Sequence, residues 1–396
     1  MVTSTTVGID TLRSQLEELC SFSRESGSPG EREAAEWVAE RLTEAGARGA
    51  RLEDEPSNGG YWWPLGLMSA VGLMAALLAR RGHRLLAALL GFAASAAAVD
   101  DPPPRRQRLR RLLPSRSAAN VMAEVGPPDA EQTVVLLAHH DAAHPGWIFS
   151  PAIPETIDRY APWIFKQANT SPPLMLPVVG GPAVVGAGAL LGSRRLRRLG
   201  AFLCAGAAAS MAEIGAREVV PGANDNGTGV IALIALARAF AEDPPDRTRI
   251  LLVSTSEEAT CEGMNHWAAR HFPELPKQST TFICLDTLGS PHLLVLRGEG
   301  MFGITEYPAE MLALLDGLAE ELGINLFPNL RLRNATDGVF PLAAGYRCAS
   351  IASCTRLKQP ANYHWPTDVP ENVDFGTVAD AIRLTEAAVR KLDSAG

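Results

Sequence analysis

Imidazole and carboxylate side chains recur in this sequence where short apolar runs end or where glycine and proline break the chain. The candidates are His139 and Asp141, Asp225, the adjacent pair Glu257 and Glu258, Asp286, and His364. Two adjacent carboxylates at the end of an apolar strand are costly unless a cation lies between them. Two imidazoles and three carboxylates at strand ends are the donors that a pair of Zn²⁺ ions prefers, with one carboxylate bridging.

Such a centre performs hydrolysis. Two metal ions ~3.5–4 Å apart can share a water, lower its pKa toward ~7 and polarise a carbonyl oxygen. A spare carboxylate beside the ligands can then take a proton from the water and pass it to a leaving amine. The sequence therefore indicates cleavage of an amide bond by a metal-activated water.

The elements that must position these side chains alternate along the chain. Apolar runs bounded by turn signals predict strands at 118–125, 134–138, 249–254, 280–285 and 293–297. Helical spacing of apolar residues predicts helices at 10–19, 35–45, 229–241, 263–271, 308–322 and 378–392. This alternation predicts an α/β fold with a mixed, largely parallel central sheet flanked by helices.

Two long apolar regions interrupt this pattern. Residues 61–79 and 85–99 flank one arginine-rich turn, and residues 173–192 and 199–211 flank another. Because a membrane-spanning helix needs ~20 apolar residues, the first run of each pair is long enough and the second is marginal. We therefore predict two inserted hydrophobic helical hairpins, at 59–105 and 146–215. The catalytic domain is then predicted in three parts, at 1–58, 106–145 and 216–396.

The hairpins predict either membrane lipid or a second copy of the chain as a partner. Seven arginines at the hairpin tips favour lipid, since long cationic side chains can reach phosphate head groups. Because 104–116 holds six more arginines, the positive-inside rule does not decide the orientation. With no export signal in the first twenty residues, we expect a membrane-associated protein with its catalytic domain on the cytoplasmic side. An external catalytic domain and a soluble cytoplasmic homodimer are the alternatives.

Composition excludes several classes of protein. Hydrophobic residues make up 46% and charged residues 20% of the chain, which excludes disorder and a collagen-like fold. The net charge of −8 gives no reason to expect a nucleic-acid partner. Six cysteines without a CxxC pair exclude a disulfide scaffold and a zinc ribbon.

Five short motifs resemble, in order, those of the co-catalytic di-zinc exopeptidases, which include bacterial leucyl aminopeptidases, aminopeptidase S and glutamate carboxypeptidase. They are AHHD (138–141), GANDNGTG (222–229), SEE (256–258), CLDTLG (284–289) and YHWPTD (363–368). The segment 334–351 is also similar to the family's stretch before a late strand. The resemblance implies the zinc exopeptidase fold, a peptide substrate and two zinc ions per chain.

The resemblance also implies a role for each residue. The metal ligands would be His139, Asp225, Glu258, Asp286 and His364, with Asp225 as the bridging carboxylate. Glu257 would be the general base, Asp141 would orient His139, Tyr363 would assist the oxyanion, and Asp368 would be supporting. His140 stands where the family more often has tyrosine, and we expect it in solvent or in the pocket rather than among the ligands.

The simplest activity under this resemblance is that of an aminopeptidase acting at or near a membrane. One alternative is a non-catalytic membrane or interaction protein that keeps the peptidase fold. Others are a glutaminyl-cyclase-like relative, which would use a single zinc, and a carboxypeptidase-like relative. The presence of all five ligands and the base favours the di-zinc hydrolase.

Overall fold

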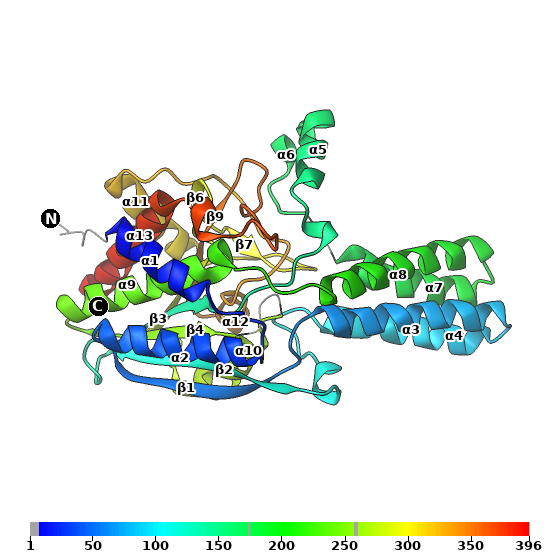
Figure 1. Ribbon diagram of the computed structural model, residues 1–396, viewed down its shortest axis with the longest axis horizontal. Coiled ribbons are helices and arrows are strands. Elements are labelled where there is room, and N and C mark those ends of the chain that lie inside the picture. Colours follow the sequence, from blue (N-terminus) through cyan, green and yellow to red (C-terminus); the bar gives the residue numbers. More distant parts are fainter. Residues whose placement is uncertain (1–7, 173–174, 257–259, 396) are drawn as a thin grey trace.

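A computed structural model describes residues 8–172, 175–256 and 260–395. Its described part contains an α/β body and a helical bundle that extends from one end of that body (Figure 1). The predicted mixed sheet flanked by helices is confirmed, with seven strands among the described residues in the order β1-β2-β4-β3-β5-β9-β6. The strands are β1 (Arg48–Ser57), β2 (Arg116–Val125), β3 (Gln132–His139), β4 (Thr248–Thr255), β5 (Thr280–Asp286), β6 (His292–Val295) and β9 (Arg347–Cys354). A separate two-stranded ribbon joins β7 (Gly298–Glu299) and β8 (Thr305–Glu306).

The four central strands run in the same direction. β4, β3, β5 and β9 pair in parallel, whereas β1, β2 and β6 add antiparallel edges. The central strands are almost continuously buried, as expected for parallel strands covered on both faces. Their carboxyl ends therefore meet at one edge of the sheet, where ligands bind in open α/β sheets.

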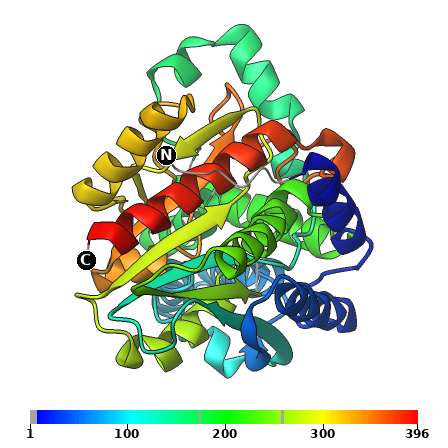
Figure 2. The same cartoon turned by 90° about the vertical axis from the view of Figure 1, so that its left-hand side faces the viewer.

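Helices cover both faces of this sheet (Figure 2). One face packs against α1 (Ile9–Leu19), α2 (Pro29–Glu44), α9 (Thr228–Glu242), α11 (Ala309–Leu322) and α13 (Phe375–Ala395). The other packs against α10 (Glu262–His271) and α12 (Val339–Ala344). Apolar residues at helical spacing, such as Leu12, Leu16 and Leu19 of α1, are fully buried against the first face.

The two predicted hairpins are helical, and they pack together as one four-helix bundle. The helices are α3 (Trp62–Arg80), α4 (Arg84–Asp100), α7 (Leu176–Leu190) and α8 (Arg194–Gly215). The arginine-rich tips lie at the free end of the bundle, and α8 begins at Arg194 inside the predicted turn. By length and composition, one described helix, Trp62–Arg80, can cross a membrane, and Leu176–Leu190 is apolar but shorter.

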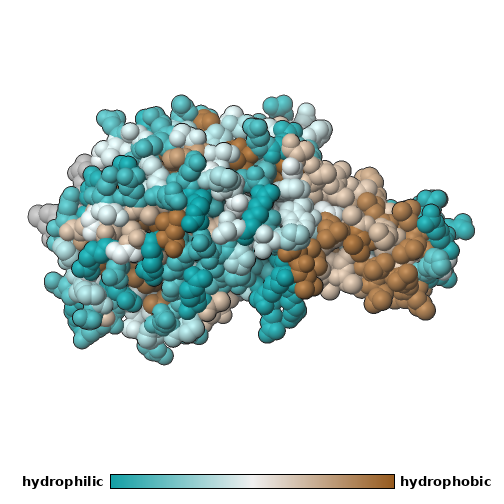
Figure 3. Space-filling model, turned by 60° about the horizontal axis from the view of Figure 1, so that its bottom comes forward, coloured by the Kyte–Doolittle hydropathy of each residue, from teal (hydrophilic) through white to brown (hydrophobic). Residues whose placement is uncertain are grey.

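The bundle has small residues inside and large apolar residues outside. Alanine, glycine, serine and cysteine fill much of its interior, including Ala75, Ala87 and Cys204, which are fully buried. The helices approach so closely that a Cβ on Gly91 would lie 2.7 Å from the carbonyl oxygen of Pro182. The face of the bundle that Figure 3 shows is largely brown with hydrophobic residues, up to a polar tip.

Candidate active site

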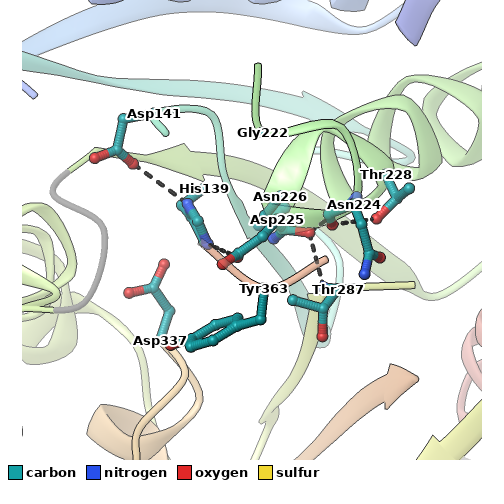
Figure 4. A network of polar contacts seen from close by, with 12 residues as sticks. His139, Asp141, Gly222, Asn224, Asp225, Asn226, Thr228, Thr287, Asp337 and Tyr363 are labelled. Atoms are coloured by element: carbon teal, nitrogen blue, oxygen red, sulfur yellow. Dashed lines mark hydrogen bonds and ion pairs between the residues drawn. The ribbon is translucent and has the colours of Figure 1, made fainter. Parts of the chain in front are cut away.

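Three of the predicted ligands converge at the carboxyl edge of the sheet. Figure 4 shows two of them, His139 and Asp225. His139 ends β3, Asp286 ends β5, and Asp225 lies on the short irregular turn Ala223–Gly227 that opens α9. These three side chains offer ligand atoms that all lie within 4.8 Å of one another. Residues far apart in the sequence are thus brought together by parallel strand pairing.

Asp225 lies between two imidazoles, and its predicted role as a bridging carboxylate stays a prediction from the sequence. Its Oδ1 is 3.4 Å from Nε2 of His139, and its Oδ2 is 3.3 Å from Nε2 of His364. The side chain is buried, and its two histidine partners lower the pKa of the carboxyl group although burial alone would raise it. Both histidines therefore present Nε2 to the same carboxylate.

Asp141 orients His139 from the other side of the ring. Its Oδ1 is 3.3 Å from Nδ1 of His139, and its Oδ2 accepts a hydrogen bond from the hydroxyl of Ser26. Burial by itself would lower the pKa of the His139 imidazole, but the neighbouring carboxylates of Asp141 and Asp225 raise the pKa well above the usual range. A carboxylate at Nδ1 fixes the ring and leaves Nε2 for a metal.

Asp368 holds the turn that carries Asp225. Its carboxylate accepts hydrogen bonds from the backbone N–H groups of Asn224 (2.7 Å) and Asp225 (3.1 Å). The side chain of Asn224 also accepts a hydrogen bond from the backbone N–H of Gly289 at 2.7 Å, which ties the turn to the segment after β5. The supporting role predicted for Asp368 thus has a structural basis in backbone positioning.

Tyr363 lines the same pocket beside His364. The two rings stack with centroids 3.9 Å apart, and the tyrosine hydroxyl accepts a hydrogen bond from Nδ2 of Asn334 at 3.0 Å. This hydroxyl is therefore held by a side chain from a different loop. Its role toward an oxyanion stays a prediction from the sequence.

Several buried carboxyl groups lie close together at the site, and their simultaneous ionisation is unfavourable without a cation. Burial, together with Asp225, Asp337 and Glu299, raises the pKa of Asp286 to about 8. Burial likewise raises the pKa of Glu299 to about 7, and that of Asp337 above its usual range. Divalent cations would relieve this repulsion, and the donor set is the one that zinc prefers.

One atom tests the fit to a metal directly. Oδ2 of Asp225 is buried and has no hydrogen-bond partner among the described residues, although His364 lies near it. A buried polar atom without a partner costs free energy, and coordination to a metal would satisfy it. The residues present therefore fit zinc.

The two adjacent glutamates lie outside the described residues. β4 ends at Thr255, and the backbone N–H of Ser256 donates a hydrogen bond to Oδ1 of Asn120 at 3.1 Å. Glu257 and Glu258 follow directly in the sequence. The general-base role of Glu257 and the ligand role of Glu258 remain predictions from the sequence.

The expected location of His140, in solvent or in the pocket, is wrong. This side chain is fully buried, with Nε2 2.9 Å from Oε1 of Glu31 and Nδ1 2.9 Å from Oγ of Ser254. Successive residues at a strand end point to opposite faces, so His140 turns away from the pocket that His139 faces. His144 also lies outside the ligand set, with Nδ1 2.6 Å from the carbonyl oxygen of Arg217.

Two residues of the pocket were missed by the sequence reasoning. Asp337 lies buried beside the ligands and accepts a hydrogen bond from the hydroxyl of Thr255. Asp337 could have been predicted from the sequence, because it lies in the segment 334–351 that resembles the family. Phe149 meets the ring of His364 edge-on at 4.4 Å, and its place inside an inserted region gave no signal.

The pocket beside the ligands has a cavity volume of about 190 Å³ and reaches the base of the bundle. One wall is formed by apolar side chains from the insertions, namely Leu65 of α3, Ile148, Phe149, Met175, Val178 of α7 and Met211 of α8. Another wall is formed by the α/β body, including Leu294, Leu296, Leu330 and Leu332. The insertions therefore shape the space in which a substrate would lie.

Comparison with solved structures shows the fold. Glutaminyl cyclase from Tannerella forsythia is 15% identical, with a TM-score of 0.58, and the match covers 98% of this chain and 99% of that chain. A Zn-dependent exopeptidase from Parabacteroides distasonis is 13% identical, with a TM-score of 0.55 and coverage of 97% and 98%. A leucine aminopeptidase precursor from Bacteroides thetaiotaomicron is 13% identical, with a TM-score of 0.56 and coverage of 98% and 99%.

Sequence comparison gives one family similarity, in the C-terminal part of the chain. The comparison with curated protein sequences gives no significant match. Residues 210–389 match the model of peptidase family M28, and this range contains Asp225, Asp286, Tyr363 and His364. The resemblance predicted from the sequence is thereby confirmed: this part of the chain is similar to peptidase family M28.

Proposed function

We propose that this chain is a co-catalytic di-zinc exopeptidase, most simply an aminopeptidase, held at a membrane by its helical bundle. The observation that carries the catalytic part is the position of Asp225 between Nε2 of His139 and Nε2 of His364, with Asp286 close by. These four residues would hold zinc together with Glu258. When bound, zinc lowers the pKa of water and polarises a carbonyl group.

The protein's own groups supply positioning and proton transfer in this proposal. Asp141 holds His139 in one ring orientation, and Asp368 holds the backbone of the turn that carries Asp225. Glu257 would accept the proton of the attacking water and return it to the leaving amine. The apolar wall from the insertions would keep bulk water away from this transfer.

A substrate panel separates the candidate activities. The zinc-loaded protein is assayed with aminoacyl amides, with acyl-glutamate substrates and with peptides that begin with glutamine. We expect release of N-terminal residues, with little cleavage of acyl-glutamate and no cyclisation. Exclusive cyclisation of N-terminal glutamine would favour the glutaminyl-cyclase alternative, and no turnover of any substrate by folded, zinc-loaded protein would favour a non-catalytic role.

The bundle has small residues inside and large apolar residues on its surface, and this arrangement supports the membrane part of the proposal. In water, a bundle gains stability by burying its large apolar side chains. Here large apolar side chains are exposed on all four helices, for example Met74 of α3 (55%), Leu89 of α4 (66%), Leu190 of α7 (54%) and Phe202 of α8 (75%). Small residues at the helix contacts are typical of helices that associate in lipid.

The dimensions and symmetry of this surface favour lipid over a second copy of the chain. At ~1.5 Å per residue, the 19 residues of α3 span ~28 Å, close to the ~30 Å hydrocarbon core of a bilayer. A dimer would cover one side of the bundle, whereas a bilayer covers every side. Arginines at the tip would meet the head groups of the distal leaflet.

Sidedness is part of the same proposal. We place the α/β body on the cytoplasmic side, with the arginine tip of the bundle on the other side of the bilayer. Labelling of a cysteine at exposed Glu40 by a membrane-impermeant thiol reagent in intact cells tests this placement. Labelling only after lysis supports the cytoplasmic side, and labelling of intact cells supports the external placement.

A further inference from the structure

The segment between β3 and α7 contains two short helices whose apolar residues face outward. α5 (Ala152–Tyr160) has no buried residue, and α6 (Trp163–Gln167) buries only Phe165. Six large apolar or aromatic side chains of residues 147–164 are exposed: Trp147 (68%), Ile153 (47%), Ile157 (37%), Tyr160 (74%), Trp163 (56%) and Ile164 (48%). Such a concentration on one short segment indicates a surface that contacts something other than water.

The exposed apolar residues of α5 lie on one face. Ile153, Ile157 and Tyr160 are spaced by four and three residues, which places them on the same side of a helix. Glu155 and Asp158 occupy other positions around it. The helix is therefore amphipathic, although it is only nine residues long.

The polar side of the segment is attached to the α/β body. Oδ2 of Asp158 lies 2.5 Å from Nη1 of Arg356, in the loop after β9. Nζ of Lys358 from the same loop donates a hydrogen bond to the carbonyl oxygen of Ala168. These contacts hold the segment by its polar side and leave its apolar side turned away from the body.

The segment also begins and ends at the pocket. Phe149 before α5 and Ser171 after α6 both line it, and Phe149 meets His364. In Figure 1, α5 and α6 stand away from the α/β body beside the end from which the bundle extends, and Figure 2 shows them at the margin of the body. The helix α5 thus lies at the level where a bilayer around the bundle would begin.

We propose that residues 147–167 form an interfacial anchor that lies on the bilayer surface and places the mouth of the pocket at the membrane. Tryptophan and tyrosine are the side chains enriched at the membrane–water interface, and three of the six exposed residues are of these types. Arg159 and Lys166 add cationic groups suited to lipid phosphates. The substrates reached most readily would then be peptide termini that lie at a membrane surface. This inference rests on the membrane part of the proposed function, not on the zinc chemistry.

Spin labels on the two faces of α5 test the anchor. The full-length protein, with Cys20 replaced by serine because the other five cysteines are buried, is placed in nanodiscs of phosphatidylcholine and phosphatidylglycerol. Labels at Ile153→Cys and Ile157→Cys are compared with a matched control on the same helix, Glu155→Cys. A label on the bundle, Leu89→Cys, reports separately whether the bundle is in lipid.

We expect oxygen to relax the labels at 153 and 157 several-fold more strongly than a water-soluble nickel complex does, with the opposite order at 155. Equal exposure to the nickel complex at all three positions, with Leu89→Cys in lipid, would overturn the anchor and leave the bundle proposal standing. Protection of positions 153 and 157 from both reagents would overturn it in favour of a protein contact. If Leu89→Cys is exposed to water, both the bundle proposal and this inference are wrong, while the hydrolase assay is unaffected.

Discussion

Polar substitution of the bundle surface should release the protein from membranes. The variant carries serine in place of Met74, Leu89, Leu190 and Phe202, one residue from each helix. Their exposed fractions add up to about two and a half fully exposed side chains. At ~1.5–3 kcal/mol for each apolar side chain moved out of water, the four substitutions remove about 4–7 kcal/mol of transfer free energy. That corresponds to a ~10³–10⁵-fold weaker partition into lipid.

Flotation with vesicles measures this effect. The wild type should rise with the lipid in a density gradient, and the variant should stay largely in the soluble fraction while it retains zinc. A control with Ile9→Ser, an exposed apolar residue of α1 on the α/β body, should float like the wild type. The reasoning is refuted if the variant floats as completely as the wild type, or if the wild type is a discrete soluble dimer without detergent.

Three further predictions concern the metal site. Glu257→Gln should keep its zinc while kcat falls by ~10²–10⁴, the usual scale for loss of a general base, whereas Glu258→Gln should weaken zinc binding. Steady-state kinetics with metal analysis checks both variants, and a near-normal kcat in Glu257→Gln would show that the two roles are misassigned. Asp141→Asn should weaken zinc affinity ~10–100-fold in a chelator-competition titration, because Nδ1 of His139 loses its carboxylate partner, while Asp374→Asn just before α13 should leave the affinity unchanged. In zinc-free protein, the pKa of Asp286 is raised to about 8, so this carboxyl group stays protonated in the folded state at pH values where it ionises in the unfolded chain. Its contribution to stability is therefore fully present below the ordinary carboxyl pKa and is lost as pH rises toward about 8. The melting temperature of the chelated protein should therefore decrease as pH rises from about 5 to about 8, and added zinc should restore it while protons are released. A melting temperature that does not change with pH would contradict repulsion between the buried carboxylates.

The parallel core was predictable because its strands are apolar along their whole length. Runs such as 134–138 and 280–285 have to be buried, and the ligands follow directly where those runs end. β1 was missed because its sequence, RGARLEDEPS, is that of a charged edge strand without an apolar face. β9 was not placed because its small residues give little periodic signal, although it lies inside the sheet.

Long-range packing accounts for most of what the sequence left open. The two apolar hairpins were recognisable separately, but their union in one bundle depends on contacts between segments ~100 residues apart. Side chains alternate between the two faces of a strand, so a shift of one residue would turn His140 to the opposite face. The sequence pattern does not fix this register. α5 and α6 were not predicted because both are shorter than the length at which periodicity identifies a helix.

The metal stoichiometry of the full-length protein tests the central claim most directly. After chelation and titration with zinc at neutral pH, elemental analysis should find two zinc ions per chain in the wild type. Because Asp225 would bridge the two ions, Asp225→Asn should lose affinity at both sites rather than at one. Folded wild-type protein that binds no zinc, or that saturates at a single ion, would contradict the co-catalytic centre.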